Sequence, residues 1–286
     1  MKNIITLMAL VVALALPYSQ ALAEPALFKT CYDAIGIHAS ENDSENSGIE
    51  RSLYVIIDES VGFDANIIGR VADMVVEWSE PGRNIEIFRF SSNVEGRYSE
   101  KILEAPYPPE ADEDFLDGIK RSMREKLGRC QKQRPMQLRS IIKRKILSTL
   151  ESADKSIPKS DIVATISELS RYINGKEQES KSVLIVSDMF ENSSITSFYS
   201  KGSIRMLNAE NEIKTMEKNN MMAEFGGADI YVVGLGYFTG NAHATSERYL
   251  DPKRRSPIIN FWKQYFSKSN GNVVEIGAPL MHGVIK

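Results

Sequence analysis

The sequence predicts an α/β fold with a doubly wound, mostly parallel sheet and helices on both faces. Short β-branched apolar runs alternate along the chain with segments whose apolar residues recur at helical spacing. Two of these runs, Leu53–Ile57 and Val183–Ser187, are each followed directly by an aspartate. Because open parallel sheets bind ligands beyond the carboxyl ends of their strands, these aspartates mark an expected binding edge.

The elements follow one another in a regular order. They are a strand at 52–57, a helix at 64–79, strands at 84–91 and 97–103, helices over 111–152, a helix from 160, a strand at 182–187, a helix at 204–224, a strand at 229–234, a helix at 257–268 and a strand at 272–276. Apolar residues three and four apart predict the helices, and short β-branched and aromatic runs predict the strands. We expect Pro81-Gly82 to end the first helix and Gly226-Gly227 to end the helix at 204–224.

The stretch 111–152 is expected to be a helical elaboration within a single domain. The proline-rich run 105–109 separates it from the preceding strand, and a turn at 133–135 is expected to divide it into two helices. No internal repeat and no interdomain linker interrupts the alternation of strands and helices. We therefore expect one domain over 51–286, preceded by a lead-in at 24–50.

The first 23 residues have the features of a secretory signal peptide. Lys2 precedes an apolar core from Ile4 to Leu16, and Ala21-Leu22-Ala23 offers a small-residue cleavage site before Glu24. This core is too short to span a bilayer, and no later stretch approaches the ~20 apolar residues of a membrane helix. We expect an exported protein without a membrane span, located in the periplasm of a Gram-negative cell.

Cysteine usage agrees with export. A bridge between Cys31 and Cys130 is the favoured interpretation in an oxidising compartment, and two separate buried thiols are the alternative. The bridge would close a loop of about 100 residues and contribute on the order of 4 kcal/mol. The histidines, His38, His243 and His282, are scattered and form no ligand pattern, so zinc hydrolase chemistry is not expected.

Charge is distributed unevenly along the chain, whose formal net charge is −3. Residues 120–145 hold eleven basic residues against Glu125 alone, a local charge of +10, which leaves −13 for the remainder. This stretch is expected to dock an anionic partner, and the solvated outer face of packed helices is the alternative. Aromatic residues are absent between 116 and 171, so single-stranded nucleic acid is not a favoured partner.

Three separate segments are expected to build one divalent-cation site. Asp58 and Ser60 follow the first strand, Ser160 opens a helix and Asp188 follows a later strand. Carboxylate and hydroxyl oxygens are the hard ligands that Mg²⁺ prefers. Asp161 is expected beside this site as an auxiliary residue. The alternative is that the aspartates cap turns and that the Ser160–Asp161 pair is an ordinary helix N-cap.

This constellation resembles the von Willebrand factor A domain family over roughly residues 50–280. In that family a metal-ion-dependent adhesion site takes Asp-x-Ser-x-Ser from the first strand, a Thr from a middle loop and an Asp from the fourth strand. The resemblance implies that Ser60 and Ser160 bind the ion directly and that Asp58 and Asp188 hold metal-bound water. It further implies a binding module, not an enzyme, whose Mg²⁺, or Mn²⁺ or Ca²⁺ in its place, receives a carboxylate of a protein partner.

The motif departs from the family pattern at three positions. Gly62 replaces the last Ser, Ser160 replaces the Thr, and Met189 stands where a Gly often follows the strand-four Asp. A degenerate site that holds no ion is therefore one alternative, with the protein acting as a scaffold that docks through its basic helices. The enzyme alternative is a metal-dependent phosphohydrolase with Asp58 as nucleophile and Ser187 as phosphate ligand. That chemistry requires a second Asp two residues after the first, where this chain has a serine.

Overall fold

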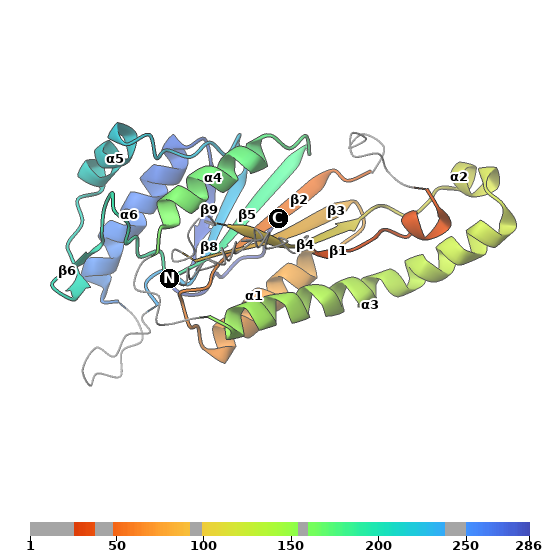
Figure 1. Cartoon of the computed structure of the whole chain (residues 1–286), viewed down its shortest axis with the longest axis horizontal. Helices are drawn as coiled ribbons and strands as arrows, with labels where there is room; N and C mark the ends of the chain where they lie inside the picture. Colours follow the sequence, from red (N-terminus) through yellow and green to blue (C-terminus); the bar gives the residue numbers. More distant parts are fainter. Residues whose placement is uncertain (1–25, 38–47, 92–98, 154–159, 238–249) are drawn as a thin grey trace, which may run out of the picture.

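The structure, a computed structural model, describes residues 26–37, 48–91, 99–153, 160–237 and 250–286. The expected signal peptide at 1–23 lies outside these ranges. Within them, seven strands form one sheet in the order β1-β4-β3-β2-β5-β8-β9 (Figure 1). These strands are β1 (Ala26–Leu27), β2 (Arg51–Asp58), β3 (Arg83–Phe90), β4 (Glu100–Tyr107), β5 (Ser180–Val186), β8 (Asp229–Val233) and β9 (Asn272–Ile276).

The sheet is doubly wound. All neighbouring strands run parallel except β3 and β4, which are antiparallel. Without the two-residue β1, the strands lie in the spatial order third, second, first, fourth, fifth, sixth of the chain. The order therefore reverses between β2 and β5, and such a reversal point is where doubly wound sheets bind ligands, beyond the carboxyl ends of the strands.

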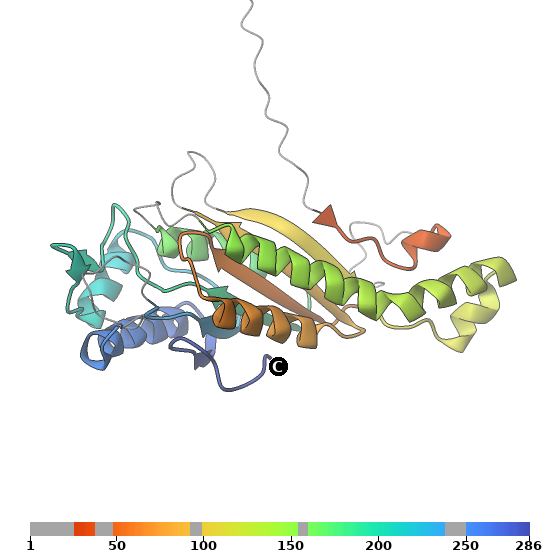
Figure 2. The same cartoon turned by 90° about the horizontal axis from the view of Figure 1, so that it is seen from below.

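Helices cover both faces of the sheet (Figures 1 and 2). On one face lie α1 (Ala65–Trp78) and α3 (Arg121–Glu151), and on the other α4 (Ile162–Asn174), α5 (Ala209–Lys218) and α6 (Pro252–Lys268). Three short elements complete the described chain: a 3₁₀ turn η1 (Asp33–Ile35), a helix α2 (Glu113–Gly118) and a hairpin of β6 (Tyr199–Ser200) and β7 (Ser203–Ile204). No helix in the described ranges is both long enough and apolar enough to span a membrane.

The central strand β2 shows why both faces carry an apolar core. Side chains alternate between the two faces of a strand, and every residue of β2 after Arg51 is buried. Leu53 and Val55 pack towards α1 and α3, whereas Tyr54 and Ile56 pack towards α4, α5 and α6. The continuous apolar run of the sequence is the pattern of a strand covered on both sides. The predicted three-layer α/β fold is confirmed.

The helical elaboration differs from the prediction in where it breaks. No turn forms at 133–135, because α3 runs without interruption from Arg121 to Glu151 with Pro135 inside it. The break lies earlier, at Ile119 and Lys120, between α2 and α3. A proline removes one backbone hydrogen bond from a helix, and here tertiary contacts on both sides of Pro135 hold the chain helical. Leu127 precedes it and Leu138 follows it, and both are fully buried.

Two other boundaries are also corrected. The expected break at 105–109 begins later, because β4 continues through Pro106 to Tyr107. On the far side of β4 from β3, β1 pairs only with Leu103 and Glu104, and proline is tolerated where a strand has a partner on one side only. The helix expected at 204–224 is shorter and ends at Lys218, before the paired glycines.

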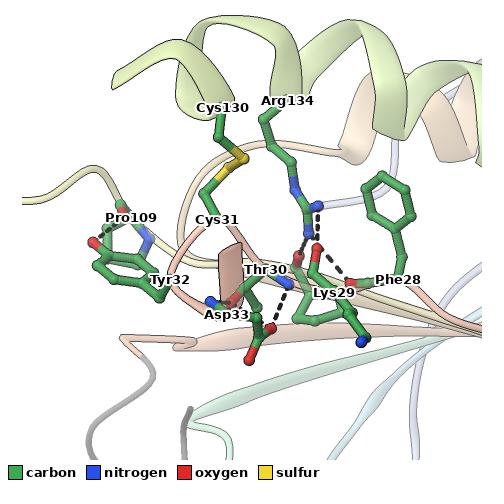
Figure 3. The surroundings of a disulfide bond; sticks show 10 residues. Phe28, Lys29, Thr30, Cys31, Tyr32, Asp33, Pro109, Cys130 and Arg134 are labelled. Carbon is green, nitrogen blue, oxygen red and sulfur yellow. Dashed lines mark hydrogen bonds between the residues drawn. A yellow bond between two sulfur atoms is a disulfide. The ribbon is translucent and has the colours of Figure 1, made fainter. Parts of the chain in front are cut away.

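The segment before β2 is fastened to α3 (Figure 3). Cys31 and Cys130 form the predicted disulfide, with their Cα atoms 5.6 Å apart. Arg134, one turn further along α3, is 3% exposed and donates hydrogen bonds to the carbonyl oxygens of Lys29 and Pro106 at 2.6 and 2.5 Å. These contacts join the N-terminal segment, β4 and α3 into one unit.

Candidate functional site

The predicted site residues meet where the strand order reverses. β2 and β5 are parallel neighbours paired from Arg51 to Ile57, so Asp58 and Asp188 leave the sheet at the same edge. Ser160 precedes α4, which packs over these two strands, and its hydroxyl lies 3.1 Å from the Asp58 carboxylate. The structure thus brings together the three sequence segments that predicted the site.

Asp58 is the centre of the cluster and is fully buried. Its Oδ1 accepts hydrogen bonds from the backbone N–H and the hydroxyl of Ser60, at 2.9 and 2.5 Å. Its Oδ2 accepts from the hydroxyls of Ser160 and Ser187, at 3.1 and 2.8 Å. Burial raises the pKa of Asp58, and the hydrogen bonds from the three serines act in the opposite direction. One carboxylate therefore collects three hydroxyls from three segments.

Asp188 is partly exposed and carries the second carboxylate of the cluster. Its Oδ1 accepts a hydrogen bond from the backbone N–H of Phe190 at 3.0 Å. Burial raises the pKa of Asp188 well above its ordinary value, and the negative charge of Asp58 raises it further. Burial raises the pKa of Tyr199 on the β6–β7 hairpin, and the charges of Asp188 and Asp58 raise it further. The Tyr199 hydroxyl therefore lies near the cluster. The two carboxylates thus give the cluster a negative electrostatic potential.

Asp161 caps a helix, as the alternative interpretation of the Ser160–Asp161 pair predicted. It is the N-cap of α4, and its side chain accepts a hydrogen bond from the backbone N–H of Ala164 at 3.3 Å. Free N–H groups at a helix start require such acceptors. Burial raises the pKa of Asp161. The auxiliary role beside a cation stays a prediction for this residue.

Sequence reasoning missed Glu191, a second acceptor at the start of α4. This residue is fully buried, and its Oε2 accepts from the backbone N–H of Val163 at 2.9 Å. Burial raises the pKa of Glu191 to about 8. Neither periodicity nor a motif indicates this contact, because the two residues are far apart in sequence and meet only when the loop after β5 crosses the start of α4.

The enzyme alternative predicts Ser187 as a phosphate ligand, whereas in the structure its hydroxyl belongs to the Asp58 cluster. Its hydroxyl donates to Asp58 and accepts from the backbone N–H of Met189 at 3.0 Å. The sequence feature that could have indicated this role is the position of Ser187 at the end of β5, directly before Asp188. Its hydroxyl is the third in the cluster, although Gly62 lacks the hydroxyl of the family motif.

Met189 adopts a backbone conformation that suits glycine. Its φ is 62°, in the left-handed region, and its side chain is fully buried. The indole N–H of Trp262 donates to its carbonyl oxygen at 2.9 Å. A non-glycine residue in this region costs roughly 1–2 kcal/mol, so surrounding contacts must hold the loop in place. The glycine expected from the family pattern is missing here, but the backbone turn that it would allow is present.

In the described part of the chain, no three histidine, cysteine or acidic side chains lie close enough to hold a metal ion by themselves. A cation bound at the Asp58 cluster would therefore depend on serine hydroxyls and water in addition to two carboxylates. This is the ligand chemistry that the resemblance to the adhesion site implied.

Comparisons with known proteins do not identify a family for this chain. No protein-family model and no curated protein matches the chain. Among solved structures, an aerotolerance-related membrane protein from Bacteroides fragilis matches with 13% identity and a TM-score of 0.36, over 81% of this chain and 92% of that one. The TFIIH p34 N-terminal domain matches with 12% identity and a TM-score of 0.30, over 82% of this chain and 94% of that one.

Likeness at this level informs neither the site nor the activity. The sheet topology and the Asp58 cluster are described from this chain's own structure. The chain is a doubly wound α/β protein with a buried carboxylate–hydroxyl cluster at the edge where such sheets bind ligands.

Proposed function

We propose that the protein is an exported binding module whose Asp58 cluster holds a divalent cation and, through it, engages a carboxylate of a protein partner. Mg²⁺ is the first candidate, with Mn²⁺ and Ca²⁺ as alternatives. The observation that supports this proposal best is the convergence of the Ser60, Ser160 and Ser187 hydroxyls on one buried carboxylate at the strand-order reversal.

The donor set fits a hard cation. A serine hydroxyl that donates its proton to Asp58 keeps lone pairs that a cation can accept. Ser60 and Ser160 both donate in this way, to different oxygens of the same carboxylate. Asp188 accepts one backbone hydrogen bond at Oδ1, and nothing in the described chain donates to its Oδ2. Oxygen ligands of this kind, completed by water, match the coordination of Mg²⁺.

The electrostatics of the cluster also favour a cation. Asp58 and Asp188 lie close enough for the charge of one to raise the pKa of the other. No lysine or arginine in the described chain forms an ion pair with either carboxylate. Buried carboxylates are usually paired with a cation or coordinate a metal. A bound divalent ion would neutralise both and leave a coordination position for a partner carboxylate.

The same geometry favours binding over catalysis. An aspartyl phosphohydrolase needs an acid two residues after its nucleophile, and here Ser60 donates its hydroxyl proton to Asp58. Asp58 is fully buried and its two oxygens accept four hydrogen bonds. The carboxylate is therefore positioned as a hydrogen-bond acceptor, which does not suit a nucleophile that must attack a phosphate. Metal-dependent turnover of a generic phosphate ester, lost in Asp58→Asn, would instead support the enzyme alternative.

The test is a calorimetric titration of the mature, EDTA-treated protein with Mg²⁺ and Mn²⁺. We expect saturable binding in the wild type, and strong weakening in Ser60→Ala and Asp188→Asn. The control is Ser203→Ala, which removes an exposed hydroxyl on β7 and should bind like the wild type. An absence of saturable binding in the wild type would overturn the cation proposal.

A gain-of-affinity variant makes the test stronger. Gly62→Ser supplies the hydroxyl that the family motif has at this position, and Gly62 does not adopt a left-handed φ, so its backbone conformation suits an L-residue. We expect tighter binding by about tenfold, the scale on which single contacts change metal affinity. An unchanged affinity would mean that position 62 does not face the ion.

The disulfide supports the export part of the proposal. Bridges of this kind form and persist in oxidising compartments such as the periplasm. Fractionation of cells that express the full chain checks this point. Recovery of the protein with periplasmic marker proteins is expected, and recovery in the cytoplasm with free thiols would contradict it.

A further inference from the structure

α3 continues beyond the sheet and forms an arm. Its N-terminal half and α2 project past the strands, whereas its C-terminal half packs beside α1 (Figures 1 and 2). The disulfide at Cys130 and the buried Arg134 fix the arm to the N-terminal segment and β4. The arm is therefore held in a defined orientation and can present side chains as a preorganised surface.

One face of α3 carries an uninterrupted row of exposed side chains, here named the basic stripe. Its members recur three and four residues apart, which places them along one side of the helix. They are Arg129, Lys132, Met136, Arg139 and Lys143, all exposed, with Met136 at 71%. Lys143 forms an ion pair with Asp73 at 3.0 Å, and in the described chain the other three basic members form none. The stripe is about 21 Å long at 1.5 Å per residue.

The end of the same arm carries the opposite charge. Four exposed acidic residues precede or open α2, and we name them the acidic tip: Glu110, Asp112, Glu113 and Asp114. None of the four forms an ion pair within the described residues. No basic residue occurs between Pro109 and Lys120 in the sequence. One arm thus presents an acidic surface without ion pairs within the described residues and a basic surface on which three of the four charges have none.

We propose that the arm docks a second copy of this chain in an antiparallel two-fold arrangement, with the acidic tip of each copy on the basic stripe of the other. In a two-fold dimer the tip of each copy meets the stripe of the other, so the same contact forms twice. The same geometry within each copy therefore serves both contacts. Charge complementarity of this kind fixes register and steers association. Met136 lies in the middle of the stripe, where a dimer would bury it.

A flat anionic membrane is a poorer occupant for the stripe. α1 lies beside α3 on the same face of the molecule (Figure 2). Its last turn exposes Glu77, and Glu80, which pairs with Arg83 at 2.6 Å, is exposed two residues after the helix ends. A lipid surface that met the stripe broadly would also meet these carboxylates, and like charges repel. A narrow acidic partner avoids them, and the acidic tip is such a partner.

A charge-swap experiment tests the proposal by sedimentation velocity. The tip variant is Glu110→Lys with Glu113→Lys and Asp114→Lys, and the stripe variant is Arg129→Glu with Lys132→Glu and Arg139→Glu. We expect the wild type to double its weight-average mass at about 50 mM salt and to dissociate at about 500 mM, because salt screens exposed charges. Each variant alone should remain monomeric, since its tip and stripe then carry the same sign. An equal mixture of the two should form a heterodimer, in which both contacts pair opposite charges.

The controls separate this result from other causes. Lys214→Glu with Lys253→Glu and Lys263→Glu makes the same change in net charge as the stripe variant on exposed residues of α5 and α6, and should dimerise like the wild type. All measurements are made in EDTA, so that the cation proposal does not affect them. A wild type that stays monomeric at low salt, or variants that do not associate when mixed, would overturn the proposal. Co-sedimentation of monomeric wild type with phosphatidylglycerol vesicles would assign the stripe to a membrane instead.

Discussion

Arg134 provides a sharp test of what holds the arm in place. It is a buried guanidinium without a carboxylate partner at hydrogen-bonding distance in the described chain. Its Nη1 donates to the carbonyl oxygen of Lys29, and its Nη2 donates to those of Pro106 and, at 3.4 Å, Phe28. The guanidinium carbon lies 4.2 Å from the centre of the Phe28 ring (Figure 3). Its Nε is buried and has no hydrogen-bond partner among the described residues. Arg134→Met keeps much of the apolar shaft and removes all of these polar contacts.

The expected effect is a balance of two terms. The two short hydrogen bonds, to Lys29 and Pro106, contribute roughly 3–6 kcal/mol together because the donor is charged, and the cation–π contact adds about 1 kcal/mol. Against this, burial lowers the pKa of Arg134 from 12.5 to about 10, which corresponds to a cost of roughly 3 kcal/mol for the charged form. The difference predicts that Arg134→Met lowers the free energy of unfolding by about 2 kcal/mol.

Urea unfolding of the oxidised protein, followed by circular dichroism, measures this difference. Arg139→Met is the matched control, because this exposed arginine lies on the same helix and should change stability by less than about 0.5 kcal/mol. Replacement of a buried charge by an apolar side chain is neutral or stabilising in some proteins. An unchanged or increased free energy of unfolding in Arg134→Met would therefore refute the reasoning, and would show that desolvation outweighs the contacts.

The remaining predictions concern other parts of the fold. Cys31→Ser with Cys130→Ser should lower the free energy of unfolding by about 2–4 kcal/mol, because the bridge closes a loop across 99 residues. Gly234→Ala should cost at least about 2 kcal/mol, since φ is 103° there and an added Cβ would lie 2.5 Å from Phe63. Glu191 ionises in the folded protein at about pH 8, above its ordinary value of 4.5, so its carboxyl disfavours the fold increasingly as the pH rises from about 4.5 to 8. Glu191→Gln should flatten this part of the stability profile and raise stability at pH 8.

Each of these predictions has a control and a contrary outcome. Urea unfolding of the cysteine variant is compared with reduced wild type, and equal stability of the oxidised wild type and the variant would argue against the bridge. Gly202→Ala is the control for Gly234→Ala. The φ of Gly202 is 78°, and no atom lies within 4 Å of an added Cβ, so this variant measures the backbone cost alone, without a contact such as that with Phe63. A Glu191→Gln profile parallel to that of the wild type would show that another group controls this pH range.

Strands and most helices were predictable because burial leaves a local signature. β9 was predicted at its observed bounds, and β2 within one residue at each end, since both are short runs between clear breaks. The errors occurred where a tertiary contact overrides a local signal. Pro135 predicts a turn from sequence alone, yet α3 continues through it between buried apolar positions. The end of α5 at Lys218 was missed, although the two asparagines that follow, with φ of 56° at Asn220, suit a helix terminus.

The sequence by itself determined the fold class and placed Asp58, Ser60, Ser160 and Asp188 at one edge of the sheet. Both follow from periodicity and from polar residues at strand ends, which are local properties. Only the tertiary structure decided which atoms meet: that Ser187 joins the cluster, that Glu191 caps α4, and that Arg134 holds the N-terminal segment. These contacts join residues far apart in the chain, and no local pattern specifies them because each depends on how separate elements pack.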